Sequence, residues 1–221
     1  MLKTIGVGMI PLFFVQFFSL LNAQVQDSVL SAEEITLVNK VEINSDLSID
    51  FKKLCHGKLF QLPQYDKFGK IISYDYPGLA CKVDEGRGNS LVLQNRNHFK
   101  KKGYFLFKHY DSSMEQDEIG IIPGKNYKDL LNYKSTNGFD SDIFTRDIID
   151  QVESWKNEYD LIITGAGSYW IELFFIILPR KPGIFIDELV IFAPGILNDF
   201  LSKQNLLNEL ITKRKILVTF M

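Results

Sequence analysis

The segment from Thr164 to Pro179, TGAGSYWIELFFIILP, combines two features that could do chemistry, a loop of small residues and a single glutamate, Glu172, within an apolar run. A glycine loop cradles a phosphate when G-x-G-x-x-G opens a helix. Here the third glycine is missing and a second apolar run follows, which is typical of two strands joined by a turn. The pattern therefore predicts a hairpin with its bend over residues 165–168, and no bound cofactor.

Glu172 is the candidate general acid or base of this segment. Alternation along the second strand places it on a face with Trp170 and Phe174. Burial among aromatic rings would raise the pKa of its carboxyl group unless a cation or a backbone donor compensates. Shifted carboxylates are enriched at functional sites, but structural ion pairs also produce them. A catalytic and a structural role therefore both stay open. A catalytic Glu172 would act with a second carboxyl group, for which the candidates are Glu188, Asp140 and Asp142.

The histidines and cysteines offer little further chemistry. His56, His98 and His109 are scattered over three local contexts, so no metal site is predicted. Nucleophilic catalysis by Cys55 or Cys81 would need a histidine brought close by the fold, and no local signature such as G-x-S-x-G supports it.

The N-terminal residues predict export. They begin with Lys3, continue through an uncharged apolar run over residues 5–21 and reach Ala23, which is the order of a signal peptide cleaved after Ala23. The alternative is a retained membrane anchor over residues 5–21, because about 17 apolar residues lie at the lower limit for spanning a bilayer. In an oxidising compartment Cys55 and Cys81 are either bonded to each other or free and buried.

Composition limits the partners. The chain has 221 residues, 46% of them hydrophobic, and a net charge of −2, so nothing favours binding to nucleic acid. We expect a protein or a small molecule as the partner, and contact with a membrane only if the N-terminal segment is uncleaved. The mature chain is long enough for one large hydrophobic core.

Hydrophobic periodicity predicts helices and strands in both halves of the chain. A capping box at Ser31 predicts a helix, residues 47–69 read as irregular, and a helix capped by Asn89 or Ser90 ends at Gly103. Further helices are expected over 126–135, from Thr145 to Glu158, over 182–192 and over 201–214, the last with Leu206, Leu207, Leu210 and Ile211 facing inward. Strands are expected over 69–84, 104–110, 118–124, 160–178 and 215–221.

These elements predict an α+β fold, in which helices pack on a mixed sheet with the 160–178 hairpin near its centre. We divide the chain into a signal peptide (1–23), a helical or irregular extension (24–60) and one main domain (61–221).

The C-terminal half contains an ordered set of short motifs: the loop Thr136-Asn137-Gly138, a helix ending at Trp155, the strand DLIITGAG, and the run Trp170-Ile171-Glu172. In this order they resemble a bacterial family, domain of unknown function 4253 (DUF4253), over about residues 110–221. Glu188, Phe192 and Pro194 match a later family pattern. The chain departs from the family at Ala193-Pro194-Gly195, where relatives show Cys-Pro-Asp, and at Val218-Thr219-Phe220-Met221, where relatives tend to end in a Trp-Trp-Asp-like run.

The family has no known activity, so the resemblance implies an architecture and no mechanism. Its motif residues Asn137, Gly138 and Trp170 are the binding candidates. Because the sequence lacks a nucleophile motif and a metal cluster, we expect a noncatalytic binding or interaction module of the cell envelope. The alternatives are a small hydrolase-like enzyme that uses Glu172 and an immunity-like protein.

Overall fold

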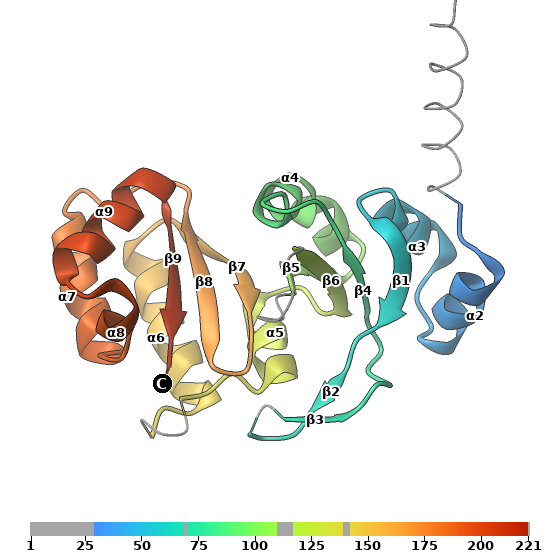
Figure 1. Cartoon of the computed structure of the whole chain (residues 1–221), viewed down its shortest axis with the longest axis horizontal. Coiled ribbons are helices and arrows are strands. Elements are labelled where there is room, and N and C mark those ends of the chain that lie inside the picture. Colours follow the sequence, from blue (N-terminus) through green and yellow to red (C-terminus); the bar gives the residue numbers. More distant parts are fainter. Residues whose placement is uncertain (1–28, 69, 110–116, 139–141, 221) are drawn as a thin grey trace, which may run out of the picture.

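A computed structural model describes residues 29–68, 70–109, 117–138 and 142–220. The main feature is a mixed seven-stranded sheet in the order β1-β4-β6-β5-β7-β8-β9, accompanied by a two-stranded sheet of β2 and β3 (Figure 1). The strands are β1 His56–Gln61, β2 Gln64–Tyr65, β3 Ile71–Ser73, β4 Leu79–Lys82, β5 Tyr104–Lys108, β6 Glu118–Pro123, β7 Leu161–Ala166, β8 Trp170–Phe175 and β9 Lys215–Thr219. The signal peptide prediction and Asp140 lie outside the described residues.

The helices that pack on the sheet are α2 Ala32–Lys40, α3 Ser45–Lys52, α4 Gly88–Lys101, α5 Tyr127–Lys134, α6 Thr145–Glu158, α7 Pro182–Phe192, α8 Ile196–Phe200 and α9 Lys203–Lys213. With the mixed sheet, they confirm the predicted α+β fold. The β7–β8 hairpin lies inside the sheet, between β5 and β9.

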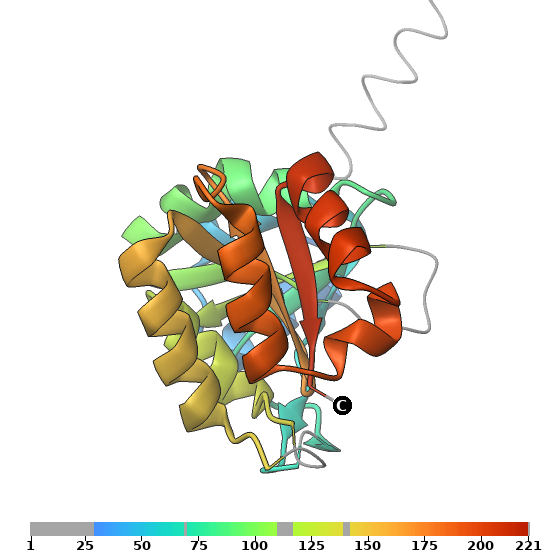
Figure 2. The ribbon, with the colours of Figure 1, turned by 90° about the vertical axis from the view of Figure 1, so that its left-hand side faces the viewer.

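Two cores form because strand residues alternate between the two faces of the sheet. On β5, Phe107 belongs to the larger core, which α5, α6, α7 and α9 cover, whereas Leu106 belongs to the smaller core beneath α3 and α4. Figure 2 views the molecule from the side of α6, α7 and α9. Trp155 of α6 is 1% exposed and packs against Phe185 of α7, with ring centroids 5.4 Å apart. The helix predicted from Thr145 to Glu158 therefore anchors the larger core.

The residues before β4 are more regular than their sequence predicts. Residues 47–69 were expected to be irregular, but α3, β1 and β2 form there, and β1 pairs antiparallel with β4 in the main sheet. The N-cap Asn44 starts α3 by accepting hydrogen bonds from the backbone N–H groups of Asp46 and Leu47. Short polar segments of this kind carry too little periodicity to be recognised without their tertiary contacts.

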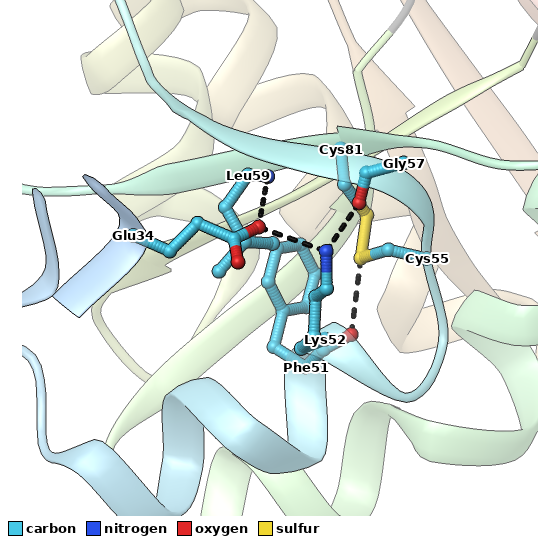
Figure 3. Close-up of a disulfide and its surroundings, with 7 residues drawn as sticks. All are labelled: Glu34, Phe51, Lys52, Cys55, Gly57, Leu59 and Cys81. Atoms are coloured by element: carbon cyan, nitrogen blue, oxygen red, sulfur yellow. Dashed lines mark hydrogen bonds and ion pairs between the residues drawn. A yellow bond between two sulfur atoms is a disulfide. The ribbon is translucent and has the colours of Figure 1, made fainter. Parts of the chain in front are cut away.

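A buried cluster joins α2 and α3 to this edge of the sheet (Figure 3). Cys55 and Cys81 form a disulfide that links the segment before β1 to β4. Beside it, Lys52 Nζ lies 2.8 Å from Glu34 Oε1, with both side chains almost fully buried, and the Leu59 N–H donates to the same oxygen at 2.9 Å. Burial would raise the pKa of Glu34, but Lys52 and the backbone donors outweigh it and lower the pKa.

Four local predictions were wrong. Helix α4 begins at Gly88 after Arg87 rather than at an Asn89 or Ser90 cap, because Asp117 Oδ2 accepts the Gly88 N–H at 2.9 Å. The hairpin bend lies at 167–169, since β7 continues through Ala166. The second strand ends at Phe175 rather than near Pro179. Ile211 is 49% exposed because α9 turns only Leu206 and Leu210 fully inward.

Candidate functional site

The sheet is split between its two parallel strands. Strands β5 and β7 are in register at Lys108 opposite Gly165, close to their carboxyl ends, and the described ladder does not continue toward their amino ends. A cavity of about 220 Å³ occupies this region. We call it the interstrand pocket and define it by its lining residues: Arg96, Asn97, Lys100, Phe105, Leu106, Lys125, Asn126, Tyr127, Lys156, Ile162 and Ile163.

Four cationic side chains line the interstrand pocket from three elements. Arg96 and Lys100 lie one turn apart on α4, so they share a face of that helix. Lys125 precedes Asn126, the N-cap of α5, and Lys156 lies in the last turn of α6. Tertiary folding thus gathers cations that lie far apart in the sequence.

The charges of this pocket are poorly compensated. Among the described residues, none of its four cations forms an ion pair with a carboxylate, although ion pairs are found elsewhere on α5 and α6. Burial lowers the pKa of Arg96, and the charge of Asp160 opposes that shift. Burial, followed by repulsion from Arg96, also lowers the pKa of Lys156. A bound anion would relieve both effects.

Apart from Asn97 and Asn126, the rest of the pocket is apolar or aromatic. Phe105 and Leu106 of β5 and Ile162 and Ile163 of β7 line it, and they contribute no titratable group. Lys156 Nζ lies 5.6 Å from the centre of the Tyr127 ring and donates a hydrogen bond to the Leu161 carbonyl oxygen at 3.1 Å. The Tyr127 hydroxyl donates to Glu153 at 2.5 Å, and its pKa is raised above the usual value by burial and by that carboxylate. The arrangement can hold an anion with an apolar portion.

Glu172, the predicted acid or base, is buried but ionised. Its Oε1 accepts a hydrogen bond from Thr164 Oγ1 at 2.7 Å, and its Oε2 lies 3.0 Å from Lys215 Nζ. Burial alone would raise the pKa of Glu172, but the charges of Lys215 and Lys108 and the Thr164 hydrogen bond outweigh it and lower the pKa. None of the cavities whose lining is described includes Glu172.

The other predicted carboxylates have different partners. Glu188 of α7 accepts a hydrogen bond from the Tyr159 hydroxyl at 3.1 Å. Asp142 lies in the loop before α6 with a left-handed backbone, φ 54°. Glu172 contacts neither residue through a described hydrogen bond or ion pair, so among the described residues it is not paired with Glu188 or Asp142.

The binding candidates Asn137 and Gly138 lie against the β7–β8 bend that precedes Trp170. The Asn137 N–H donates to the Ser168 carbonyl oxygen at 2.7 Å, and Thr136 Oγ1 donates to the Gly167 carbonyl oxygen at 2.7 Å. A side chain at Gly138 would meet Phe220 at 2.8 Å, which requires glycine there. Trp170 is 6% exposed and packs against Gly167. These residues join the loop to the hairpin.

The histidines have separate environments. His109 is buried with its Nδ1 2.7 Å from Lys134 Nζ, and burial together with the Lys134 charge lowers its pKa well below the usual value. His56 and His98 lie near Asp84 and Asp50, respectively. Within the described ranges, no three histidine, cysteine or acidic side chains gather as ligands for a metal ion.

Sequence reasoning missed the interstrand pocket. None of its four cations, Arg96, Lys100, Lys125 and Lys156, was a candidate site residue. The one available signal was the spacing of Arg96 and Lys100, which predicts two cations on one helix face.

The fold and this pocket define an α+β protein with a split mixed sheet and a cationic cavity at the split. No protein family, curated protein or solved structure with which the chain was compared matches it. Its membership of DUF4253 therefore stays a prediction. In the part of the chain that the structure describes, every helix is too short or too polar to cross a bilayer.

Proposed function

We propose that this chain is an exported, noncatalytic binding module whose small-molecule ligand occupies the interstrand pocket. The observation that carries the proposal is that four cationic side chains line an apolar cavity without an ion-paired carboxylate. Unpaired cations cost folding energy when they are partly buried, so their convergence favours a ligand that supplies the missing charge.

The environment of Glu172 supports binding over catalysis. A general acid that works near neutral pH needs a raised pKa and access to a substrate. Glu172 has a lowered pKa because Lys215, Lys108 and Thr164 hold its ionised form. Glu172 also lies away from the interstrand pocket. Gly165 of β7 pairs with both Lys108 of β5 and Glu172 of β8, near the carboxyl end of the β5–β7 pair, and the pocket lies toward the other end. We therefore assign Glu172 a structural role.

Recognition of a partner protein, as in an immunity-like protein, is the second candidate. Ile184 and Ile191 are seven residues apart on α7, 49% and 82% exposed, and Leu201 after α8 is 84% exposed. The Asp187–Lys203 ion pair, at 2.5 Å, lies between α7 and the start of α9. Exposed apolar side chains are favourable for protein contact where they gather into a patch. Replacing Ile191 by Lys would abolish such an interaction and leave binding in the interstrand pocket unchanged.

The proposal is tested by screening a fragment library of neutral, cationic and anionic compounds by two-dimensional NMR. We expect hits that shift the backbone amides of Phe105, Leu106, Ile162 and Ile163. The Arg96→Gln variant should lose the anionic hits, whereas Lys101→Gln, which changes a lysine on the same helix outside the pocket, should retain them. A complete screen with no compound in the pocket would overturn the proposal.

A further inference from the structure

We propose that the ligand of the interstrand pocket is a small phosphomonoester, in which a phosphoryl dianion is joined to a compact apolar body. This inference rests on the proposed function and specifies the chemistry of its ligand. Three properties of the pocket support it: the excess of positive charge, the directions from which the donors come, and the apolar residues beside them.

The charge excess matches a dianion. Arg96, Lys100, Lys125 and Lys156 line the pocket, and the carboxylates that act on Arg96 and Lys156 are Asp160 and Glu153. Glu153 is also engaged by Lys128 at 3.0 Å. Counted against these two carboxylates, the four cations leave an excess of two positive charges. A phosphomonoester carries about −1.5 to −2 charges at pH 7, whereas a carboxylate carries one.

The donors come from three elements rather than from one helix face. Arg96 and Lys100 come from α4, Lys125 comes from the β6–α5 connection, and Lys156 comes from α6. A phosphoryl group has three terminal oxygens pointing in different directions and can accept bonds from all three elements. The Arg96 guanidinium can bind two of these oxygens with its planar fork. A carboxylate accepts hydrogen bonds only in the plane of its two oxygens, so it matches donors from three elements less well than a phosphoryl group does.

The apolar lining of the pocket favours a ligand with an apolar portion over inorganic phosphate alone. Phe105, Leu106, Ile162 and Ile163 line the same cavity as the cations, and an ion alone would leave them in contact with water. The cavity of about 220 Å³ is below the range of roughly 300–1,000 Å³ that is typical of sites for drug-sized ligands. The body joined to the phosphate is therefore about as large as one ring.

Calorimetric titration of the oxidised protein at pH 7.5 compares phenyl phosphate, benzoate, phenol and inorganic phosphate. We expect phenyl phosphate to bind at least tenfold more tightly than any of the other three. Its affinity should rise between pH 5 and pH 7, as its second proton is lost near pH 6, whereas that of benzoate should not. Arg96→Gln and Lys156→Gln should each lower the affinity for phenyl phosphate at least tenfold, and Lys101→Gln should leave that affinity unchanged.

The outcomes separate this inference from the proposed function. If benzoate binds in the pocket as tightly as phenyl phosphate, the dianion assignment is overturned and the binding module stands. If phenyl phosphate binds the Arg96→Gln and Lys156→Gln variants as tightly as wild type, the assignment of its binding site to the interstrand pocket is overturned. If neither these four compounds nor any library fragment binds, both proposals fail.

A further arm identifies the source of the phosphomonoester. Vesicles that contain phosphatidate present the same group on a lipid. Retention of the protein on them, with displacement by phenyl phosphate, supports the proposal with a lipid source. Binding of phenyl phosphate without retention supports it with a soluble source.

Discussion

Lys215 Nζ lies 3.0 Å from Glu172 Oε2, so β9 provides a counter-ion for a carboxylate that β8 buries beside it. The two residues are neighbours across the antiparallel pair, since Glu172 is opposite Leu217 and Phe174 is opposite Lys215. The Glu172 side chain is 5% exposed and that of Lys215 is 29% exposed, so the pair reaches from the sheet toward solvent. The pair therefore fixes β9 onto the hairpin.

Replacing Glu172 by Gln should destabilise the protein in a pH-dependent way. The pKa of Glu172 is lowered in the folded state, so its contribution to stability is present above the unfolded value of 4.5 and is lost as pH falls through the folded pKa. We expect the free energy of unfolding of Glu172→Gln to be lower by about 2 kcal/mol at pH 7. Urea unfolding monitored at pH 7, 5 and 3 measures the difference.

The matched control is Glu209→Gln, which removes a partly exposed i,i+4 pair with Lys213 on α9. It should change the free energy of unfolding by less than about 0.5 kcal/mol at every pH. An equal loss of stability at pH 3 and pH 7 for Glu172→Gln would show that shape, rather than charge, explains the effect.

The disulfide should account for much of the stability of the N-terminal edge. Cys55 and Cys81 are 26 residues apart, and closing a loop of that length is worth about 3.5 kcal/mol in the chain-entropy model. We expect reduction to lower the midpoint of urea unfolding, and the Cys55→Ala/Cys81→Ala double variant to be insensitive to reductant. A wild-type midpoint that reductant leaves unchanged would contradict this.

Local patterns predicted much of the fold. On the apolar face of the Thr145 helix, Ile148, Val152 and Trp155 are buried and Ile149 is partly buried. The two apolar runs around Gly167 form the expected hairpin. Such elements were recognisable because their periodicity is present within about fifteen residues. The lowered pKa of Glu172 was not recognisable from the sequence, because its counter-ion Lys215 is 43 residues further along the chain.

The interstrand pocket was unpredictable for the same physical reason. Arg96 and Lys156 are 60 residues apart and meet only because α4 and the end of α6 approach the same gap between β5 and β7. No sequence pattern marks where a parallel ladder stops. The small residues of the hairpin form the more apparent sequence pattern, although their role is packing.

Neutralising Arg96 should leave the fold intact. Arg96 is partly buried and has no ion-paired carboxylate among the described residues, so Arg96→Gln removes a repulsion from Lys156. We expect the free energy of unfolding to stay within about 0.5 kcal/mol of wild type or to rise. The pKa of Lys156, followed by NMR of its side-chain carbons, should increase. Lys101→Gln should change neither quantity, and a loss of more than about 1 kcal/mol in Arg96→Gln would make Arg96 a structural residue.

Export predicts a defined N-terminus. If residues 1–23 are a signal peptide, expression of the full chain in a bacterium with a secretion pathway should yield a protein whose first residue is Gln24. Intact mass spectrometry of the periplasmic fraction measures this directly. Leu21 is larger than the residue usually found three positions before a cleavage site, and Leu21→Ala should accelerate processing. Recovery of the uncleaved chain in the membrane fraction would favour the anchor over residues 5–21.

Gly167 should tolerate no side chain because the hairpin bend packs directly on Trp170. A Cβ atom at position 167 would lie 2.1 Å from Trp170 Nε1, and the Gly167 N–H and carbonyl oxygen are both hydrogen-bonded. We expect Gly167→Ala to lower the free energy of unfolding by about 1–3 kcal/mol. Gly183→Ala in α7 is the control, since its Cβ would meet no atom within 4 Å and alanine favours a helix, so its stability should stay equal or rise. Equal stability of the two variants would contradict the packing role of Gly167.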